Sequence, residues 1–248
     1  MSAPKGKKIR KKNSLFAPVS FLLICAALVF GLSVFFRVND ITVIGNGQYT
    51  AEEIIEASGI QQGDNLFFIN RGAAVARINN RLPYVESAYI SRSLPNRLTI
   101  TVAESDAIAA IPSENSGLWV IDRGCKLLSQ ANGAADGLIY IEGLTAIAPE
   151  VGQVVAAGES ESPKVAYLAV ILRELSELGL KGDVSSIDMS NISNPSFRYL
   201  DRFTVKLGTN ENLDYKFSVL LSTVEKLAEG DRGTLDLSID RRAHLTYD

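Results

Sequence analysis

Apolar residues are distributed unevenly along the chain, and their spacing predicts three regions. Near the start, residues 15–36 read LFAPVSFLLICAALVFGLSVFF, a stretch without a charged side chain. From residue 38 to 104, strand-like alternation and helical spacing follow one another. Beyond residue 106, short strand-like segments alternate with turns and with two longer amphipathic stretches. The pattern predicts one long apolar helix followed by two mixed α and β regions.

The first apolar stretch is long enough to cross a membrane as a helix. Its 22 residues extend about 33 Å at ~1.5 Å per residue, against a hydrocarbon core of about 30 Å. Fourteen of them are Leu, Ile, Val or Phe, which favours insertion by about 4 to 8 kcal/mol. The alternative is a cleaved signal peptide, whose shorter apolar core is followed by small residues. Residues 34–37 are bulky, so we expect an uncleaved anchor.

Charge predicts how this anchor is oriented. Residues 1–14 contain six cations and no acid: Lys5, Lys7, Lys8, Arg10, Lys11 and Lys12. By the positive-inside rule, this tip stays in the cytoplasm and the chain from residue 37 lies outside. The net charge is −3 with 25 basic and 28 acidic residues, so residues 15–248 hold 25 − 6 = 19 basic side chains and a net charge of −9. An acidic exterior disfavours nucleic acid as a partner.

Two folded regions are predicted outside the membrane. The first has strands at 38–46, 85–93 and 98–104 and helices at 50–59 and 73–81. Thr50 and Glu53 have the spacing of a capping box, and Gly59 is placed to end the first helix. The second region has predicted strands at 107–111, 118–121, 126–129, 138–142, 184–189, 197–207 and 234–239 and predicted helices at 164–178 and 213–228. Residues 240–248 are interpreted as a ragged extension of the last strand.

Four segments follow one another along the chain: VNDITVIGN, TAEEIIEASGIQQGDNLFFIN, PYVESAYISRSLPNRLTITVAE and WVIDRGCKLL. Their residues and their order resemble the DivIB/FtsQ family of bacterial cell-division proteins. The segments lie within residues 37–130, and the remainder is similar in architecture alone. The resemblance implies an α+β fold with a single transmembrane helix, a POTRA domain of order β-α-α-β-β and a distal β-rich domain with two packing helices. The implied segments are a basic tail at 1–14, the membrane helix at 15–36, the POTRA domain at 37–105, the distal domain at 106–232, and a last strand with a C-terminal tail at 233–248.

The resemblance also implies a function without chemistry. Members of this family act as scaffolds that recruit and hold other division proteins at the septum, and they use no cofactor. The implied partners are single-pass division proteins of the DivIC/FtsB type and of the FtsL type, with no small-molecule substrate. The implied location is the cell membrane, enriched at the division septum.

A partner-binding segment follows from the same resemblance. In the FtsQ branch, a partner adds a strand beside the last β-strand, which corresponds to residues 234–239 running into 240–247. The residues implied in binding are Leu235, Asp236, Leu237, Ile239, Arg241 and Tyr247. Ile239 stands where that branch has an aromatic residue, and Arg241 and Arg242 replace a small Ser-Gly pair. The alternative is that Leu235, Leu237 and Ile239 alternate because they belong to the core.

Two other classes of protein remain as alternatives. A membrane-anchored enzyme that modifies the cell wall would need a catalytic constellation, yet His244 is the only histidine and is near the C-terminus. Cys125 is either a small buried hydrophobe or a free thiol, and Cys25 lies in the apolar stretch and cannot pair with it. An outer-membrane assembly factor would need a long series of alternating barrel strands, which two amphipathic helices interrupt here. Both classes are therefore disfavoured.

Overall fold

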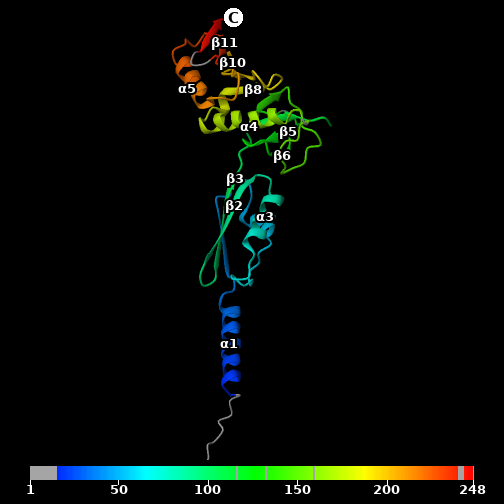
Figure 1. Ribbon diagram of the computed structural model, residues 1–248, viewed down its shortest axis with the longest axis vertical. Helices are drawn as coiled ribbons and strands as arrows, with labels where there is room; N and C mark the ends of the chain where they lie inside the picture. Colours follow the sequence, from blue (N-terminus) through cyan, green and yellow to red (C-terminus); the bar gives the residue numbers. More distant parts are fainter. Residues whose placement is uncertain are drawn as a thin grey trace, which may run out of the picture.

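The computed structural model describes residues 16–115, 117–131, 133, 135–158, 160–239 and 243–247. The molecule is elongated: the helix α1 (Phe16–Phe35) lies at one end, a small domain follows, and a larger domain lies at the far end (Figure 1). The window Pro18–Phe35 has a mean hydropathy of 2.4 and is not covered by the rest of the protein. The predicted apolar helix is confirmed, and it fits a single membrane span.

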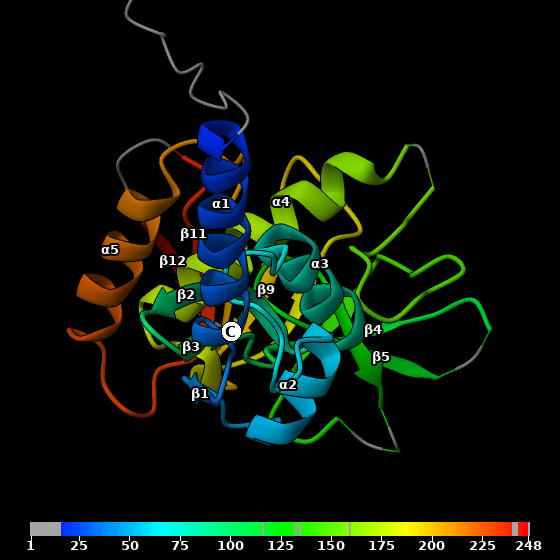
Figure 2. The ribbon, with the colours of Figure 1, turned by 90° about the horizontal axis from the view of Figure 1, so that it is seen from below.

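The small domain contains a three-stranded sheet and two helices. Its elements are β1 (Asp40–Ile44), α2 (Ala51–Ser58), α3 (Arg71–Arg81), β2 (Val85–Ser93) and β3 (Arg97–Glu104). The strand order is β1-β3-β2, with β1 parallel and β2 antiparallel to β3. Both helices lie on the same side of this sheet (Figure 2). The predicted order of strand, helix, helix, strand, strand is confirmed.

Local signals explain where the first helix of this domain begins and ends. The Oγ1 of Thr50 accepts a hydrogen bond from the Glu53 backbone N–H at 3.2 Å, and the Glu53 carboxylate accepts one from the Thr50 N–H at 2.8 Å. This reciprocal pair satisfies donors that a helix start leaves unpaired. Gly59 ends the helix in the left-handed conformation at φ +67°, which a residue without Cβ adopts at little cost. The predicted capping box and helix end are confirmed.

The larger domain is built on a nine-stranded sheet. Its elements are β4 (Ala109–Pro112), β5 (Leu118–Ile121), β6 (Leu127–Gln130), β7 (Ile139–Glu142), α4 (Ser162–Glu177), the 3-10 turn η1 (Lys181–Asp183), β8 (Val184–Asp188), β9 (Ser196–Tyr199), β10 (Phe203–Lys206), α5 (Leu213–Val224), β11 (Gly233–Asp236) and β12 (His244–Tyr247). The strand order is β12-β11-β10-β9-β8-β7-β4-β5-β6. The β-rich domain with two helices is confirmed.

The connections of this sheet explain why both helices cover one face. α4 joins the parallel neighbours β7 and β8, and α5 joins the parallel neighbours β10 and β11. All four strands run in the same direction, and both connections move toward β12. Crossovers between parallel strands are right-handed, so both helices must lie on the same side. α4 and α5 contact each other there.

Two predicted strands in this domain are wrong. The segment predicted as one strand at 197–207 forms the hairpin β9–β10, which turns at Leu200 and Asp201 with φ of +53° and +54°. Neither residue is glycine, so the residue types at these two positions did not indicate a turn with positive φ. The segment predicted as the last strand at 234–239 leaves the sheet after Asp236. The supposed ragged extension instead contains the true last strand, β12.

The two domains have separate hydrophobic cores. One buried cluster draws on β1–β3, α2 and α3, and includes Ile54, Leu66 and Ile100. The other draws on the nine-stranded sheet, α4 and α5, and includes Phe203 and Phe217. The clusters share no residue, so each domain buries its own apolar surface.

Candidate functional site

A polar joint connects the two domains. Ser105, at the end of the small domain, donates a hydrogen bond to the Asp122 carboxylate at 2.9 Å, and both residues are buried. The other Asp122 oxygen accepts from the backbone N–H groups of Gly124 and Lys126 at 2.8 and 2.9 Å. Lys126 also donates to the carbonyl of Val85 at 2.9 Å. Asp122 therefore holds its own turn and the end of the small domain together.

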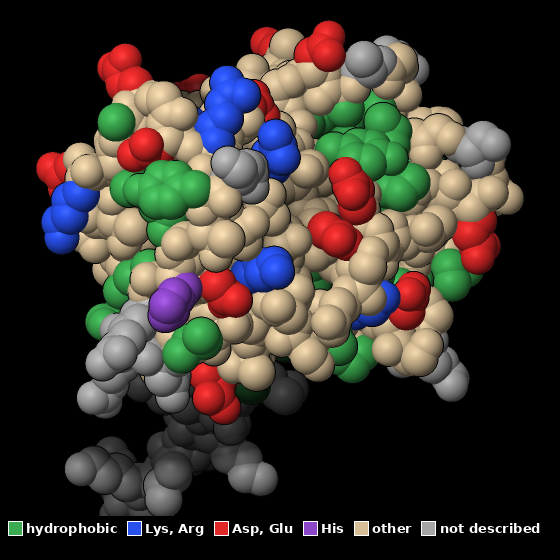
Figure 3. All heavy atoms as spheres, turned by 90° about the horizontal axis from the view of Figure 1, so that it is seen from above, with side chains coloured by type: hydrophobic (Ala, Val, Ile, Leu, Met, Phe, Trp, Pro, Cys, Tyr) green, Lys and Arg blue, Asp and Glu red, His purple; other side chains and the backbone are tan. Residues whose placement is uncertain are grey.

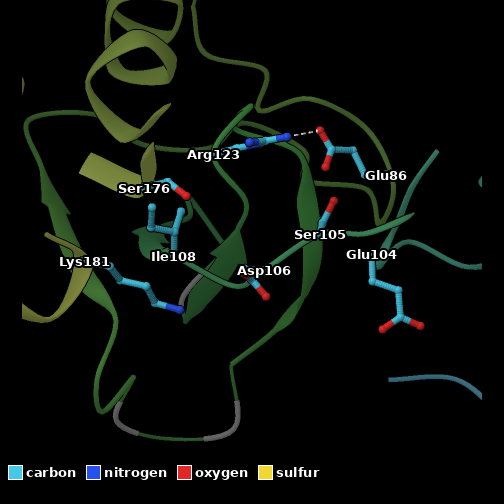
Figure 4. A pocket seen from close by; sticks show the side chains of 8 residues that line it. All are labelled: Glu86, Glu104, Ser105, Asp106, Ile108, Arg123, Ser176 and Lys181. Atoms are coloured by element: carbon cyan, nitrogen blue, oxygen red, sulfur yellow. Dashed lines mark hydrogen bonds and ion pairs between the residues drawn. The ribbon is translucent and has the colours of Figure 1, made fainter. Parts of the chain in front are cut away.

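A shallow cleft lies beside this joint. Arg123 reaches across it and binds Glu86 of β2 at 2.7 Å (Figure 4). The Glu86 carboxylate raises the pKa of the Arg123 guanidinium by hydrogen bonding and by charge. The cleft measures about 180 Å³, which is below the ~300–1,000 Å³ of ordinary ligand pockets. A second hollow at this joint, lined by Glu86, Arg123 and Glu177 among others, measures about 330 Å³. The Arg123–Glu86 ion pair lines both hollows and connects the two domains.

The far end of the molecule presents the edge of the large sheet. β12 pairs with β11 in antiparallel register, with Leu245 opposite Leu235 and His244 opposite Asp236. β12 lies at the end of the strand order, and among the described residues no further strand pairs with it. We call the outer side of β12 the distal edge. An unpaired strand edge offers backbone donors and acceptors to an added strand.

The hydrogen bonds of β11 determine which groups face outward. The N–H groups of Gly233 and Leu237 donate to carbonyls of Arg202 and Lys206, at 3.2 and 2.8 Å, on the β10 side. Because alternate residues of a strand point their backbone groups to opposite neighbours, the residues between them, Thr234 and Asp236, face β12. The two residues of β12 opposite these, at 244 and 246, face back toward β11. The backbone groups at 245 and 247 therefore point away from the sheet, into the distal edge.

The predicted partner-binding residues fall into three groups. Leu235 and Leu237 are buried in the core at 0% and 3% exposure, so their alternation has a packing role. Ile239 and Tyr247 are exposed, at 53% and 62%, and Asp236 accepts a hydrogen bond from the Ser238 N–H at 2.9 Å. Arg241 lies outside the described residues. The structure thus leaves two exposed apolar side chains near the distal edge.

Sequence reasoning missed β12 as a separate strand. Its residues read HLTY, in which Leu245 alone packs against the core and its neighbours are exposed. Four residues give only one clear alternation, which is too short to indicate a strand by itself. The β-branched and aromatic residues Thr246 and Tyr247 were the available signal.

Figure 3 shows the distal end from above. Its hydrophobic side chains form several separate groups between charged ones of both signs. The sheet has one face opposite α4 and α5. On that face, polar residues such as Thr204, Thr234 and Thr246 alternate with the core residues of the same strands. The distal end therefore combines an open strand edge with a few individual exposed side chains.

The two residues considered above for catalysis, Cys125 and His244, lie in different environments. Cys125 is fully buried, and burial raises the pKa of its thiol to about 12, so the interpretation as a small hydrophobe is confirmed. His244 is exposed on the edge strand β12. Among the described residues, no three His, Cys, Asp or Glu side chains are grouped as metal ligands.

Comparisons with known proteins identify relatives of the whole chain. A family model described as POTRA domain, FtsQ-type, matches residues 36–105. The chain is 25% identical over 244 residues to the cell division protein DivIB of Clostridium botulinum strain Hall, covering 95% of this chain and 92% of the relative. It is 29% identical over 144 residues to DivIB of Bacillus subtilis strain 168, covering 56% and 54%. It is 27% identical over 210 residues to the cell division protein FtsQ of Anaeromyxobacter sp. strain K, covering 83% and 68%.

Proposed function

The chain belongs to the DivIB/FtsQ family of bacterial cell division proteins, and from this premise we propose that it is a non-enzymatic scaffold of the division machinery. α1 spans the membrane with the N-terminus inside, and the two domains lie outside. Partners bind to these domains and are thereby held together at the septum. A membrane tether raises their effective concentration, so that each contact can be weak and reversible.

The single observation that carries this proposal is the distal edge. It lies at the end of the molecule that is farthest from α1 (Figure 1). An extracytoplasmic segment of a DivIC/FtsB-like protein, itself associated with an FtsL-like protein, adds a strand beside β12. The outward backbone groups of Leu245 and Tyr247 provide the hydrogen bonds, and the exposed side chains of Ile239 and Tyr247 provide apolar contacts.

A binding measurement tests this mode directly. The full chain is placed in lipid nanodiscs and titrated with the extracytoplasmic segment of the DivIC-like protein from the same bacterium. Tyr247→Pro removes an outward N–H while leaving the β11-facing groups of its neighbours in place, and edge strands tolerate proline there. We expect Tyr247→Pro to weaken binding about tenfold relative to wild type, and more than Tyr247→Ala, which keeps the N–H.

The matched control lies at the other edge of the same sheet. Ala131 donates to Leu118 of β5 at 2.8 Å, so the N–H of Gln130 in β6 points away from β5. Gln130→Pro therefore removes an outward donor at the wrong edge and should leave binding unchanged. Full affinity of Tyr247→Pro, or no binding by wild type at ~100 µM, would overturn the proposal.

A further inference from the structure

The loop at residues 64–68 is tied directly to the end of α1. The Asn65 side-chain amide donates to the carbonyls of Leu32 and Ser33 at 3.1 and 3.3 Å. These carbonyls belong to the last turn of the helix, where backbone acceptors are left without a full set of helical partners. The Leu32 carbonyl also accepts from the Phe36 N–H at 3.4 Å. Leu66 also donates its N–H to the carbonyl of Phe36 at 2.9 Å. The loop is thus held at the level of the last helical turn.

That level coincides with the surface of the bilayer. α1 has 20 residues, which extend about 30 Å and match the ~30 Å thickness of the hydrocarbon core. When α1 spans the membrane, its last turn lies at the outer boundary between acyl chains and head groups. The loop bonded to that turn must lie in the same interfacial layer.

The side chains at this level are apolar and exposed. Phe67 and Phe68 in the loop are 49% and 82% exposed, and Leu94 at the tip of the β2–β3 hairpin is 62% exposed. The hairpin is held nearby because Asn96 accepts a hydrogen bond from the N–H of Asn39 at 2.9 Å. Loop and hairpin both lie at the end of the small domain that faces α1 (Figure 1). We call Phe67, Phe68 and Leu94 the membrane-proximal rim.

The rim continues the apolar surface of α1. Phe36, just after the helix, contacts Phe35 on one side and Phe67 on the other, with ring centroids 5.2 and 4.9 Å apart. Arg37, the first charged residue after the apolar stretch, is exposed beside them. Aromatic side chains with a neighbouring cation are typical of the interfacial layer of membranes.

We propose that the membrane-proximal rim inserts into the outer interfacial layer of the bilayer that α1 crosses. The lipid surface is therefore a binding partner of the POTRA domain, in addition to its protein partners. Together with α1, the loop and the hairpin make three contacts with the membrane, which fix the tilt of the domain. A fixed tilt holds the distal edge at a defined height and direction above the membrane.

Tryptophan fluorescence in vesicles tests the inference. The full chain carries Trp119 alone, so a Trp119→Phe background allows a single reporter at Phe68→Trp. Vesicles contain phosphatidylcholine and phosphatidylglycerol, with or without a phosphatidylcholine brominated high on its acyl chains. We expect the emission of the Phe68→Trp reporter to shift to shorter wavelength when vesicles are added. Brominated lipid should reduce its intensity by about half, as for a side chain that lies 5–10 Å into the interface.

Controls separate the possible outcomes. Tyr89→Trp, on β2 and about 17 Å along the strand from the hairpin tip, is similarly exposed at 64% and should not be quenched. Leu94→Trp gives an independent reporter of the rim if Phe68→Trp does not fold as its parent does. Equal, weak quenching at positions 68, 94 and 89 overturns the inference, as does a blue shift that depends on protein density and thus indicates a second copy.

The inference rests on the membrane span of the proposed function, and one further reporter distinguishes their failures. Leu28→Trp lies within α1 and is exposed, so it should be strongly quenched. Quenching at 28 without quenching at 68 and 94 overturns the rim contact alone. Absence of quenching at all three positions overturns the membrane span itself.

Discussion

The two sheets of the molecule differ in how their edge strands are protected from pairing with a further strand. In the POTRA domain, the edge strand β2 carries a bulge between Val85 and Ser87, and bulges discourage the addition of another strand. In the distal domain, β6 is partly covered, because Leu127 donates its N–H to Gln153 at 2.8 Å. β12 has neither device among the described residues. The comparison favours β12, at the end farthest from α1, over β2 and β6 as the place where a strand could be added.

The domains also differ in what they expose. Among the exposed large apolar side chains of the POTRA domain, Phe67, Phe68 and Leu94 lie at the level of α1, whereas those of the distal domain include Ile239 and Tyr247 in its C-terminal segment. Both domains expose other apolar side chains elsewhere. Between them lies the polar joint around Asp122. Two independent cores with a polar joint should respond separately to mutation, and variants in each region test this difference.

The largest effect is expected in the distal core. Phe217 is fully buried and stacks on Phe197 with centroids 5.8 Å apart, so Phe217→Ala should cost about 3–5 kcal/mol. Trp119, in β5, reports unfolding of this domain by fluorescence. Amide exchange in α3 should stay slow, because that helix belongs to the other core. Tyr215→Ala, exposed on the same helix, is the control; concerted loss of both domains would contradict the separation.

The stability of the polar joint should depend mainly on its buried residue, Asp122. Asp122→Ala leaves the buried Ser105 hydroxyl and two backbone N–H groups without their acceptor, which should cost about 2–3 kcal/mol. Arg123→Ala removes an ion pair whose side chains are 44% and 42% exposed and should cost no more than about 1 kcal/mol. Denaturant titration followed by Trp119 measures both. A larger cost for Arg123→Ala than for Asp122→Ala would show that the exposed pair, and not Asp122, holds the joint.

The pairing of β12 should fail when Gly233 is changed. Gly233 has φ of +150°, and a Cβ there would collide with the backbone carbonyl of Thr246. We expect Gly233→Ala to cost about 1–3 kcal/mol and to expose the Thr234 and Asp236 amides to hydrogen exchange. Gly230→Ala adds a Cβ in open space and should leave that exchange slow. Retained protection in Gly233→Ala would show that β12 is not held as described.

The smallest effect is expected at the start of α2. Hydrogen bonds from Thr50 lower the pKa of Glu53 below its ordinary value. A lowered pKa means that the carboxylate stabilises the fold above its unfolded pKa, and that this contribution is lost as the pH falls through the folded pKa. The melting temperature of wild type should therefore be slightly higher than that of Glu53→Gln at about pH 7. The two melting temperatures should be equal at about pH 2. A difference that persists in acid would contradict a charge effect.

Prediction from sequence succeeded best where a few neighbouring residues decide the outcome. The capping box at Thr50 and Glu53, the helix end at Gly59 and the strands of the β2–β3 hairpin depend on contacts within a few residues. Prediction failed at Leu200 and Asp201, whose left-handed turn is stabilised by strand pairing on both sides. It also failed for β12, which pairs with β11. The sequence from the end of β11 to β12 carries only weak strand and turn signals.

For the candidate site, the sequence suggests a segment, and the structure adds its geometry. Asp236, Ile239 and Tyr247 do lie near the distal edge, while Leu235 and Leu237 are core residues. Which strand forms the edge could not be read from alternation, because a buried strand and an edge strand of four residues share the same pattern. The direction in which each backbone N–H points could be assigned only from the register of β10, β11 and β12.

The sequence by itself determined the apolar helix, the order of elements in the POTRA domain and the helix caps, because hydrophobic length, periodicity and side-chain to backbone hydrogen bonds act locally. Only the tertiary structure decided the order of the nine strands, the identity of β12 as the edge, and the alignment of Phe67, Phe68 and Leu94 with the end of α1. These features join residues that are far apart in the chain, and their free energy exists only once the sheets and cores have assembled.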